Sequence, residues 1–220
     1  MKTYSPKETP DKEFLELIRV WDIPTRVFHW LLVVCFVGAW ATDGSEGRRE
    51  MHLMFGYTML GLVLFRVFWG FVGSYYARFS SFECHPRKVI QYFKALLSGQ
   101  PEHHVGHTPG GALAALALLT LGASVCGLGI ATMEVSELDL GDQLFQFHHV
   151  LAIVMAVMVG IHLLGVLVGT LAHKESLLVY SMIFGRKWGR HDDRIGRRRW
   201  VIGLLLFSAV AGYWASVVLK

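Results

Sequence analysis

Five long apolar blocks constrain this chain more than any other feature of its sequence. They cover residues 27–42, 51–72, 111–132, 147–171 and 200–219. A helix needs about 20 apolar residues to cross the hydrocarbon core of a bilayer, where every backbone polar group must find an internal partner. The chain is 53% hydrophobic and only 17% charged, which is too apolar for a soluble domain. We therefore predict an all-α integral membrane protein.

The distribution of Lys and Arg predicts the orientation of these spans. Because each span crosses the membrane, the segments between the spans alternate between its two sides. The segments richest in basic residues, 1–26, 73–110 and 172–199, then share one side. They hold seventeen Lys and Arg, whereas the opposite segments, 43–50 and 133–146, hold only Arg48 and Arg49. Positive charge collects on the cytoplasmic side. We expect a bacterial cytoplasmic (inner) membrane protein with a cytoplasmic N-terminus and a periplasmic C-terminus. Its basic segments then face anionic lipid rather than nucleic acid.

Histidines at the ends and within the spans indicate a functional site. Five of the eleven are placed there: His29, His52, His148, His149 and His162. The other six, including His107, fall in the expected cytoplasmic loops, where a solvated imidazole is ordinary. At 1.5 Å per residue, His162 lies about 20 Å deeper than the start of its span, near the depth of His29. His52 opens its span at the periplasmic end, level with the adjacent pair. The intramembrane histidines therefore form two levels.

Two levels, each with imidazoles from two helices, predict two haems b stacked across the membrane. Histidine on both faces of a haem iron gives a six-coordinate site, which carries electrons because no position is open to substrate. A zinc site would need its ligands at one point. A proton relay would ordinarily use Asp or Glu within the spans, and the interiors of the five spans contain neither.

Two assignments at these levels stay open. His148 precedes His162 by 14 residues and lies about 40° from its helix face, whereas His149 lies about 140° away. His148 is therefore the favoured ligand and His149 the alternative. Arg66 is an intramembrane charge 14 residues after His52, at the depth of the cytoplasmic haem. It either binds a haem propionate or extends to the cytoplasmic headgroups.

An ordered set of motifs gives the chain a resemblance to a known family. The motifs, within residues 18–188, are VWDIPTRVFHWLL, HLMFGYTMLGLVLFRVFWGFVGSYYARFSSF, GHTPGGALAALALL, HHVLAIVMAVMVGIHLLGV and SMIFGRKW. Together they resemble the prokaryotic cytochrome b561 family, whose relatives include the b-type cytochrome subunits of nickel–iron hydrogenases. The resemblance implies a four-helix transmembrane bundle that holds two haems b. Carried over by motif, the axial ligands are His29, His52, His148 and His162.

The resemblance also suggests how the chain is divided. The common members of the family stop after four spans, so the fifth is an addition without an inherited role. We expect a cytoplasmic N-terminal segment, a dihaem cytochrome b membrane domain, a basic cytoplasmic linker and an additional transmembrane helix. Their respective bounds are residues 1–26, 27–188, 189–199 and 200–220. We also expect residues 86–97 to form a short helix on the membrane surface.

These features favour transmembrane electron transfer between the quinone pool and a periplasmic redox partner such as a c-type cytochrome. A quinone is a further candidate ligand, and no residue is assigned a catalytic role. One alternative is an oxidoreductase that acts on a small molecule, such as superoxide, at a haem edge. Another is the membrane anchor cytochrome b subunit of a hydrogenase or dehydrogenase. The two outer loops contain seven acidic residues and two arginines, which favours a basic redox partner over a stand-alone enzyme.

Overall fold

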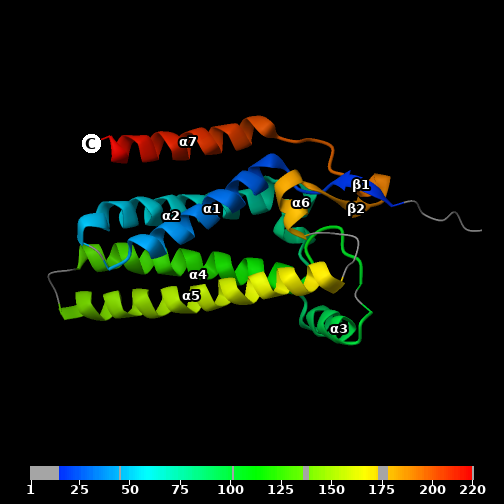
Figure 1. Cartoon of the computed structure of the whole chain (residues 1–220), viewed down its shortest axis with the longest axis horizontal. Helices are drawn as coiled ribbons and strands as arrows, with labels where there is room; N and C mark the ends of the chain where they lie inside the picture. The colour runs from blue at the N-terminus through cyan, green and yellow to red at the C-terminus, as the bar shows by residue number, and fades with distance from the viewer. Residues whose placement is uncertain (1–14, 45, 101, 136–138, 173–177, 220) are drawn as a thin grey trace, which may run out of the picture.

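The computed structural model describes residues 15–44, 46–100, 102–135, 139–172 and 178–219, which are mostly helical (Figure 1). Five of its helices are long and apolar enough to cross a membrane. They are α1 (Ile23–Thr42), α2 (Arg49–Val72), α4 (Pro109–Glu134), α5 (Asp139–Ala172) and α7 (Trp200–Val218). Each predicted span therefore corresponds to one long helix.

Two of these helices begin four or more residues earlier than the apolar blocks predict. Helix α1 begins at Ile23 rather than at residue 27, because Asp22 caps it and Pro24 occupies its first turn. Proline is well suited to the first turn, where its missing N–H costs no hydrogen bond. Helix α5 begins at Asp139, eight residues before the predicted start. Hydropathy identifies only the part of a helix that is apolar enough for lipid, so a polar extension escapes it.

The long helices form two pairs that pack on each other. Helix α1 lies along α2, α4 lies along α5, and α2 contacts α4 to join the pairs (Figure 1). The apolar core contains residues from all four, including Phe28, Leu62, Val125 and Met155. Helix α7 packs on α1 and α2, where the Trp214 Nε1–H group donates to Thr58 Oγ1 at 2.9 Å. The division between residues 27–188 and 200–220 stays a prediction.

Short elements gather at one end of the molecule, here called the sheet end (Figure 1). They include α3 (Pro86–Leu97), which is the predicted short helix, and α6 (Leu178–Phe184). Strands β1 (Glu16–Arg19) and β2 (Arg186–Gly189) pair antiparallel. Short 3₁₀ turns cover Tyr75–Ala77, Phe79–Ser81 and His191–Asp193 at this end, and Glu46–Arg48 at the opposite end. This sheet differs from the all-α prediction. The sequence could not reveal it, because a strand of four residues is too short to show a clear alternation of polar and apolar residues, and its partner lies far away in the sequence.

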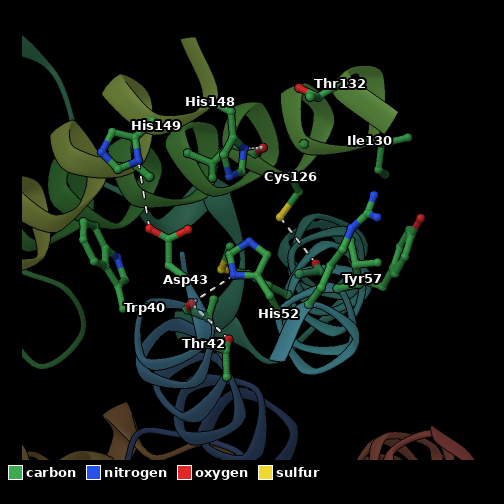
Figure 2. Close-up of a pocket in the computed structure, with 18 of the residues that line it drawn as sticks. Trp40, Thr42, Asp43, His52, Tyr57, Cys126, Ile130, Thr132, His148 and His149 are labelled. Carbon is green, nitrogen blue, oxygen red and sulfur yellow. Dashed lines mark hydrogen bonds and ion pairs between the residues drawn. The ribbon is translucent and has the colours of Figure 1, made fainter. Parts of the chain in front are cut away.

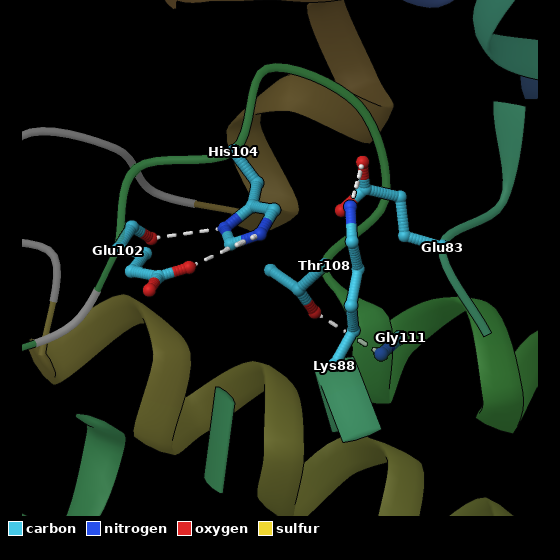
Figure 3. Close-up of polar contacts among 6 residues, drawn as sticks. All are labelled: Glu83, Lys88, Glu102, His104, Thr108 and Gly111. Carbon is cyan, nitrogen blue, oxygen red and sulfur yellow. Dashed lines mark hydrogen bonds and ion pairs between the residues drawn. The ribbon is translucent and has the colours of Figure 1, made fainter. Parts of the chain in front are cut away.

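Polar contacts fix the loop that leads into α4 (Figure 3). Thr108 Oγ1 caps the helix by accepting from the Gly111 N–H at 3.0 Å, and the neighbouring His104 ring contacts the backbone oxygen of Glu102 at 3.0 Å. From β2, the buried Lys187 ammonium donates to the backbone oxygen of His104 at 2.7 Å. Burial lowers the pKa of Lys187 to about 8. The loop is thus tied to the sheet, which holds the residues before α4 against the helices.

Asp22 connects the start of α1 to α2. Its carboxylate is fully buried and accepts from the Thr25 N–H at 3.0 Å and the Thr25 hydroxyl at 2.5 Å. It also accepts from the Trp69 Nε1–H group on α2 at 3.1 Å. A buried carboxylate needs such partners, since an unpaired charge away from water is very costly. These contacts fix the angle at which α1 enters the helix bundle.

We expect Asp22→Ala to destabilise the protein by roughly 2–4 kcal/mol, from the lost helix cap and the unpaired Trp69 donor. Asp22→Asn keeps a side-chain oxygen as acceptor and should cost clearly less. The midpoint of unfolding in mixed detergent micelles measures both. Equal losses for the two variants would contradict the assigned hydrogen bonds.

Candidate functional site

A cavity of about 430 Å³ lies between α1, α2, α4 and α5, at the end of the molecule opposite the sheet end. This volume is within the range of about 300–1,000 Å³ that is typical of cofactor and ligand sites. Its walls are largely apolar, and the polar side chains include three histidines: His52, His148 and His149 (Figure 2). The sequence analysis had placed these three at one level.

His52 and His148 face each other across this cavity (Figure 2). Their ring centres are 6.2 Å apart, and the ring planes are inclined by 74°. A bond from a metal to an imidazole nitrogen is about 2.0 Å long, so two rings on opposite sides of one metal have centres about 6 Å apart. The pair therefore has the separation expected of two axial ligands to a single metal.

The hydrogen bonds of the two rings leave one particular nitrogen available on each. His52 Nδ1 lies 3.0 Å from the backbone oxygen of Ala39 on α1. His148 Nδ1 lies 2.9 Å from the backbone oxygen of Val125 on α4. A carbonyl oxygen only accepts, so Nδ1 carries the proton in both rings and Nε2 keeps its lone pair. Metal-binding histidines are commonly oriented by such second contacts.

A glycine on α4 makes room for the His148 ring. A Cβ atom at Gly129 would lie 3.2 Å from two atoms of that ring, closer than ordinary van der Waals contact. The missing side chain therefore lets the imidazole lie against the helix, within reach of the Val125 carbonyl one turn earlier.

His149 points elsewhere (Figure 2). Its Nδ1 lies 4.0 Å from Asp43 Oδ2, beyond the end of α1, and about half of its side chain is exposed. Both histidines line the cavity, but His148 faces His52 whereas His149 contacts the loop after α1. The choice of His148 over His149 as the ligand stays a prediction.

The second pair of histidines lies toward the sheet end. His29 on α1 and His162 on α5 are near enough to interact electrostatically. His29 Nδ1 is buried and has no hydrogen-bond partner among the described residues. A buried polar atom without a partner needs an explanation, and an absent ligand or ion supplies one.

His107 is a residue that the sequence interpretation missed. It was expected in a solvated loop, yet its ring lies 4.7 Å from that of Trp21 and 4.5 Å from that of Phe82. Burial, together with smaller effects of the nearby Arg66, Lys187 and His162, lowers its pKa to about 3. The ring is therefore neutral at pH 7. Its position just before a span, in GHTPGG, was the only signal in the sequence.

The buried Arg66 lies near His107, since both side chains lie against the Phe82 ring. Arg66 is 4% exposed, and its guanidinium carbon lies 5.0 Å from the centre of the Phe79 ring. Arg66 Nη1, Arg78 Nε and His107 Nδ1 are all buried without a hydrogen-bond partner in the described part of the chain. Arg66 thus turns into the protein rather than toward a headgroup region. The guanidinium of Arg66, with a buried nitrogen that the described residues leave unpaired, suits an anionic group such as a propionate.

The donor set of each level suits haem iron better than a metal held by protein alone. Within the described ranges, no group of three or more His, Cys, Asp or Glu side chains could hold a metal ion. Two imidazoles are too few for a tetrahedral zinc site, but they complete the coordination of a haem iron, whose other four ligands come from the macrocycle.

The fold and the cavity define a multi-pass membrane protein with histidines paired between its helices. The chain belongs to the prokaryotic cytochrome b561 family, whose model matches residues 20–185. Membership in this family implies a membrane-bound b-type cytochrome that contains haem b and takes part in electron transfer.

Two curated relatives are also similar to the chain. Both are described as a probable Ni/Fe-hydrogenase B-type cytochrome subunit, one from Azotobacter chroococcum mcd 1 and one from Azotobacter vinelandii. Each is 26% identical, over a match that covers 58% of this chain and 65% of the relative. The match thus spans slightly less than two thirds of the relatives' own length. No solved structure matches the chain significantly.

The adjacent histidines can be distinguished by substitution. We expect His148→Ala to abolish one low-spin haem signal in the electron paramagnetic resonance spectrum, because it removes the ring that faces His52. His149→Ala is the matched control and should retain every low-spin signal, since its ring contacts Asp43 instead. The reverse outcome would make His149 the ligand.

Proposed function

We propose that this protein carries electrons across the bacterial cytoplasmic membrane through two bis-histidine haems b, between the quinone pool and a periplasmic redox partner such as a c-type cytochrome. The observation that carries the proposal is the His52–His148 pair. Its ring centres are 6.2 Å apart, and both Nδ1 atoms are bonded to backbone oxygens of neighbouring helices. The haems would supply irons that change oxidation state by one electron.

In this proposal His52 and His148 bind one haem, and His29 and His162 bind the other. Support for the second pair is the buried Nδ1 of His29, which has no partner among the described residues, and an electrostatic interaction between His29 and His162. The two histidines of α5 are 14 residues apart, which corresponds to about 21 Å along the helix. Such a spacing would put the two haems near opposite faces of the bilayer.

Side-chain donors of this chain would bind the propionates of the haem between His29 and His162. Arg66 and Arg78 each have a buried nitrogen without a partner among the described residues, and so does the neutral His107. Bonds from a guanidinium to a carboxylate are among the stronger hydrogen bonds in proteins. Burial of Arg66 against Phe79 and Phe82 keeps water away from such a contact.

The proposed architecture is a haem-binding bundle of α1, α2, α4 and α5 with α7 as an additional helix outside it. The sheet end faces the cytoplasm in this arrangement, because the basic segments lie there. The cavity with His52 and His148 then opens near the periplasmic surface, where a partner protein could approach.

Haem content tests the pairing. We expect two haems b per chain by the pyridine haemochrome assay, and one after substitution of any of the four ligands by alanine. The two alanine variants of one histidine pair should lose the same haem. His52→Ala and His148→Ala should therefore give matching redox titrations. Two haems retained in His52→Ala would contradict the proposal that His52 and His148 bind one of them.

A second candidate function is that of a membrane anchor subunit for a hydrogenase or a similar dehydrogenase. The observation that favours it is the description of both curated relatives as probable hydrogenase cytochrome subunits. Helix α7 could bind such a partner, since its residues Trp200, Leu205 and Phe207 are exposed. In that case the partner would stay bound rather than dock transiently.

Acidic residues near the cavity that contains His52 and His148 favour transient docking of a basic partner. Seven acids stand in the loops and adjoining helix ends: Asp43, Glu46, Glu50, Glu134, Glu137, Asp139 and Asp142. Of these, Glu137 and the side chains of Glu46 and Asp139 lie outside the described residues. Glu50, Glu134 and Asp142 are exposed. Opposite charges on two redox proteins steer their encounter and raise the association rate.

The rate of electron transfer to a soluble c-type cytochrome should fall roughly tenfold or more as ionic strength rises to the physiological value, because salt screens this attraction. Stopped-flow spectroscopy measures the rate. Joint Glu50→Gln, Glu134→Gln and Asp142→Asn substitution should flatten the salt dependence. A matched triple variant at the sheet end, Glu83→Gln with Glu102→Gln and Asp192→Asn, should leave it unchanged. A rate insensitive to salt and to the first triple variant would favour the anchor function.

A further inference from the structure

Four arginines surround a second cavity, of about 290 Å³, at the sheet end of the molecule. They come from four different parts of the chain: Arg19 of β1, Arg26 of α1, Arg186 of β2 and Arg198 just before α7. The backbone holds these segments together, since the Ile23 N–H donates to the Arg198 oxygen at 3.2 Å. The cavity is separate from the one that contains His52 and His148.

The arginines of this cavity repel one another. Arg19 and Arg186 are direct partners in the antiparallel ladder, where like charges opposite each other are destabilising. Burial lowers the pKa of Arg19, and the nearby Arg198, Arg186 and Arg194 lower it further. No ion pair joins the four arginines to a carboxylate in the described part of the chain. Positive charge concentrated without a counter-charge is the arrangement that binds an anion.

Two of the four side chains are held by backbone oxygens. Arg26 donates through Nε to the Met182 oxygen at 3.4 Å and through Nη2 to the Ile183 oxygen, both on α6. Arg19 Nη1 lies 3.5 Å from the Gly196 oxygen. Arg186 and Arg198 are exposed at the mouth. The fixed pair would form the base of an anion site, and the exposed pair would close over the anion.

The rest of the cavity wall is aromatic and aliphatic. It consists of Trp21, Ile23, Tyr180 and Phe184. The rings of Tyr180 and Phe184 have centres 4.4 Å apart, and Phe184 is 55% exposed. The wall continues on the outer surface of α6, where Val179 and Ile183 are also exposed. A ligand with a charged head and an apolar tail would match a basic cavity beside such a surface.

We propose that this arginine cavity binds a phosphate group, and that the natural source is the headgroup of an anionic phospholipid of the cytoplasmic leaflet. Guanidinium groups bind phosphate oxygens in pairs of parallel hydrogen bonds. The aromatic wall would accommodate the first part of the acyl chains. A free inorganic phosphate has the same headgroup chemistry and lacks the tail. The proposal is independent of the number of haems and of their ligands.

Lipid titration of the haem-loaded, detergent-purified full chain tests this site. Native mass spectrometry measures the affinity for phosphatidylglycerol, with zwitterionic phosphatidylcholine as the comparison without net charge and inorganic phosphate as the tail-free probe. We expect Arg186→Gln with Arg198→Gln to weaken phosphatidylglycerol binding by roughly tenfold, because two charge-assisted contacts are lost. The matched control is Arg194→Gln with Arg197→Gln, which removes the same charge from the same basic region but outside this cavity. It should change the affinity less than about twofold.

The other outcomes separate the sources of phosphate. Binding of phosphatidylglycerol without binding of inorganic phosphate supports the lipid, whereas equal effects of both probes assign the site to free phosphate and overturn the lipid source. Equal losses in the test and control variants would mean general attraction to basic residues and would overturn the site itself. The haem spectrum of each variant checks its folding, and the single variant Arg198→Gln repeats the test if the double variant is unstable.

Discussion

The hydrogen bond between a histidine Nδ1 and a backbone oxygen of the neighbouring helix is the interaction on which the site depends. His52 on α2 is tied to α1, and His148 on α5 is tied to α4. Each helix pair therefore orients one imidazole, and packing of α2 on α4 brings the two rings to 6.2 Å. A shift of either pair would separate the rings, so the same contacts determine the spacing of the helices and the proposed iron coordination.

The sheet end depends on contacts of a different kind. Asp22 connects α1 to α2, and Lys187 holds the loop before α4 against β2. Together these contacts put His107 near Arg66, in a region where several buried polar atoms have no partner among the described residues. The proposed propionate site and the arginine cavity both belong to this end. Both are concentrations of positive charge beside an apolar surface, and each would be stabilised by an anion.

The sequence could predict whatever depends on position along a single helix. Hydropathy identified the five spans, and the rise of 1.5 Å per residue assigned the histidines to levels. The preference for His148 over His149 as a ligand follows from the same helix geometry and stays a prediction. The sequence could not predict the burial of His107, which depends on Trp21 and Phe82 from distant segments. Likewise, Arg19 and Arg186 become neighbours only through a strand pairing that spans most of the chain.

The central claim is that the protein holds two haems, each between histidines of different helices. The most direct test is an anomalous difference map, measured at the iron absorption edge from crystals of the haem-loaded protein. The account predicts two iron peaks, one between His52 and His148 and the other between His29 and His162. Since the two α5 histidines are 14 residues apart, the peaks should be separated by about 20 Å along the bundle. A single iron peak, or a peak bonded to His149 instead of His148, would contradict it.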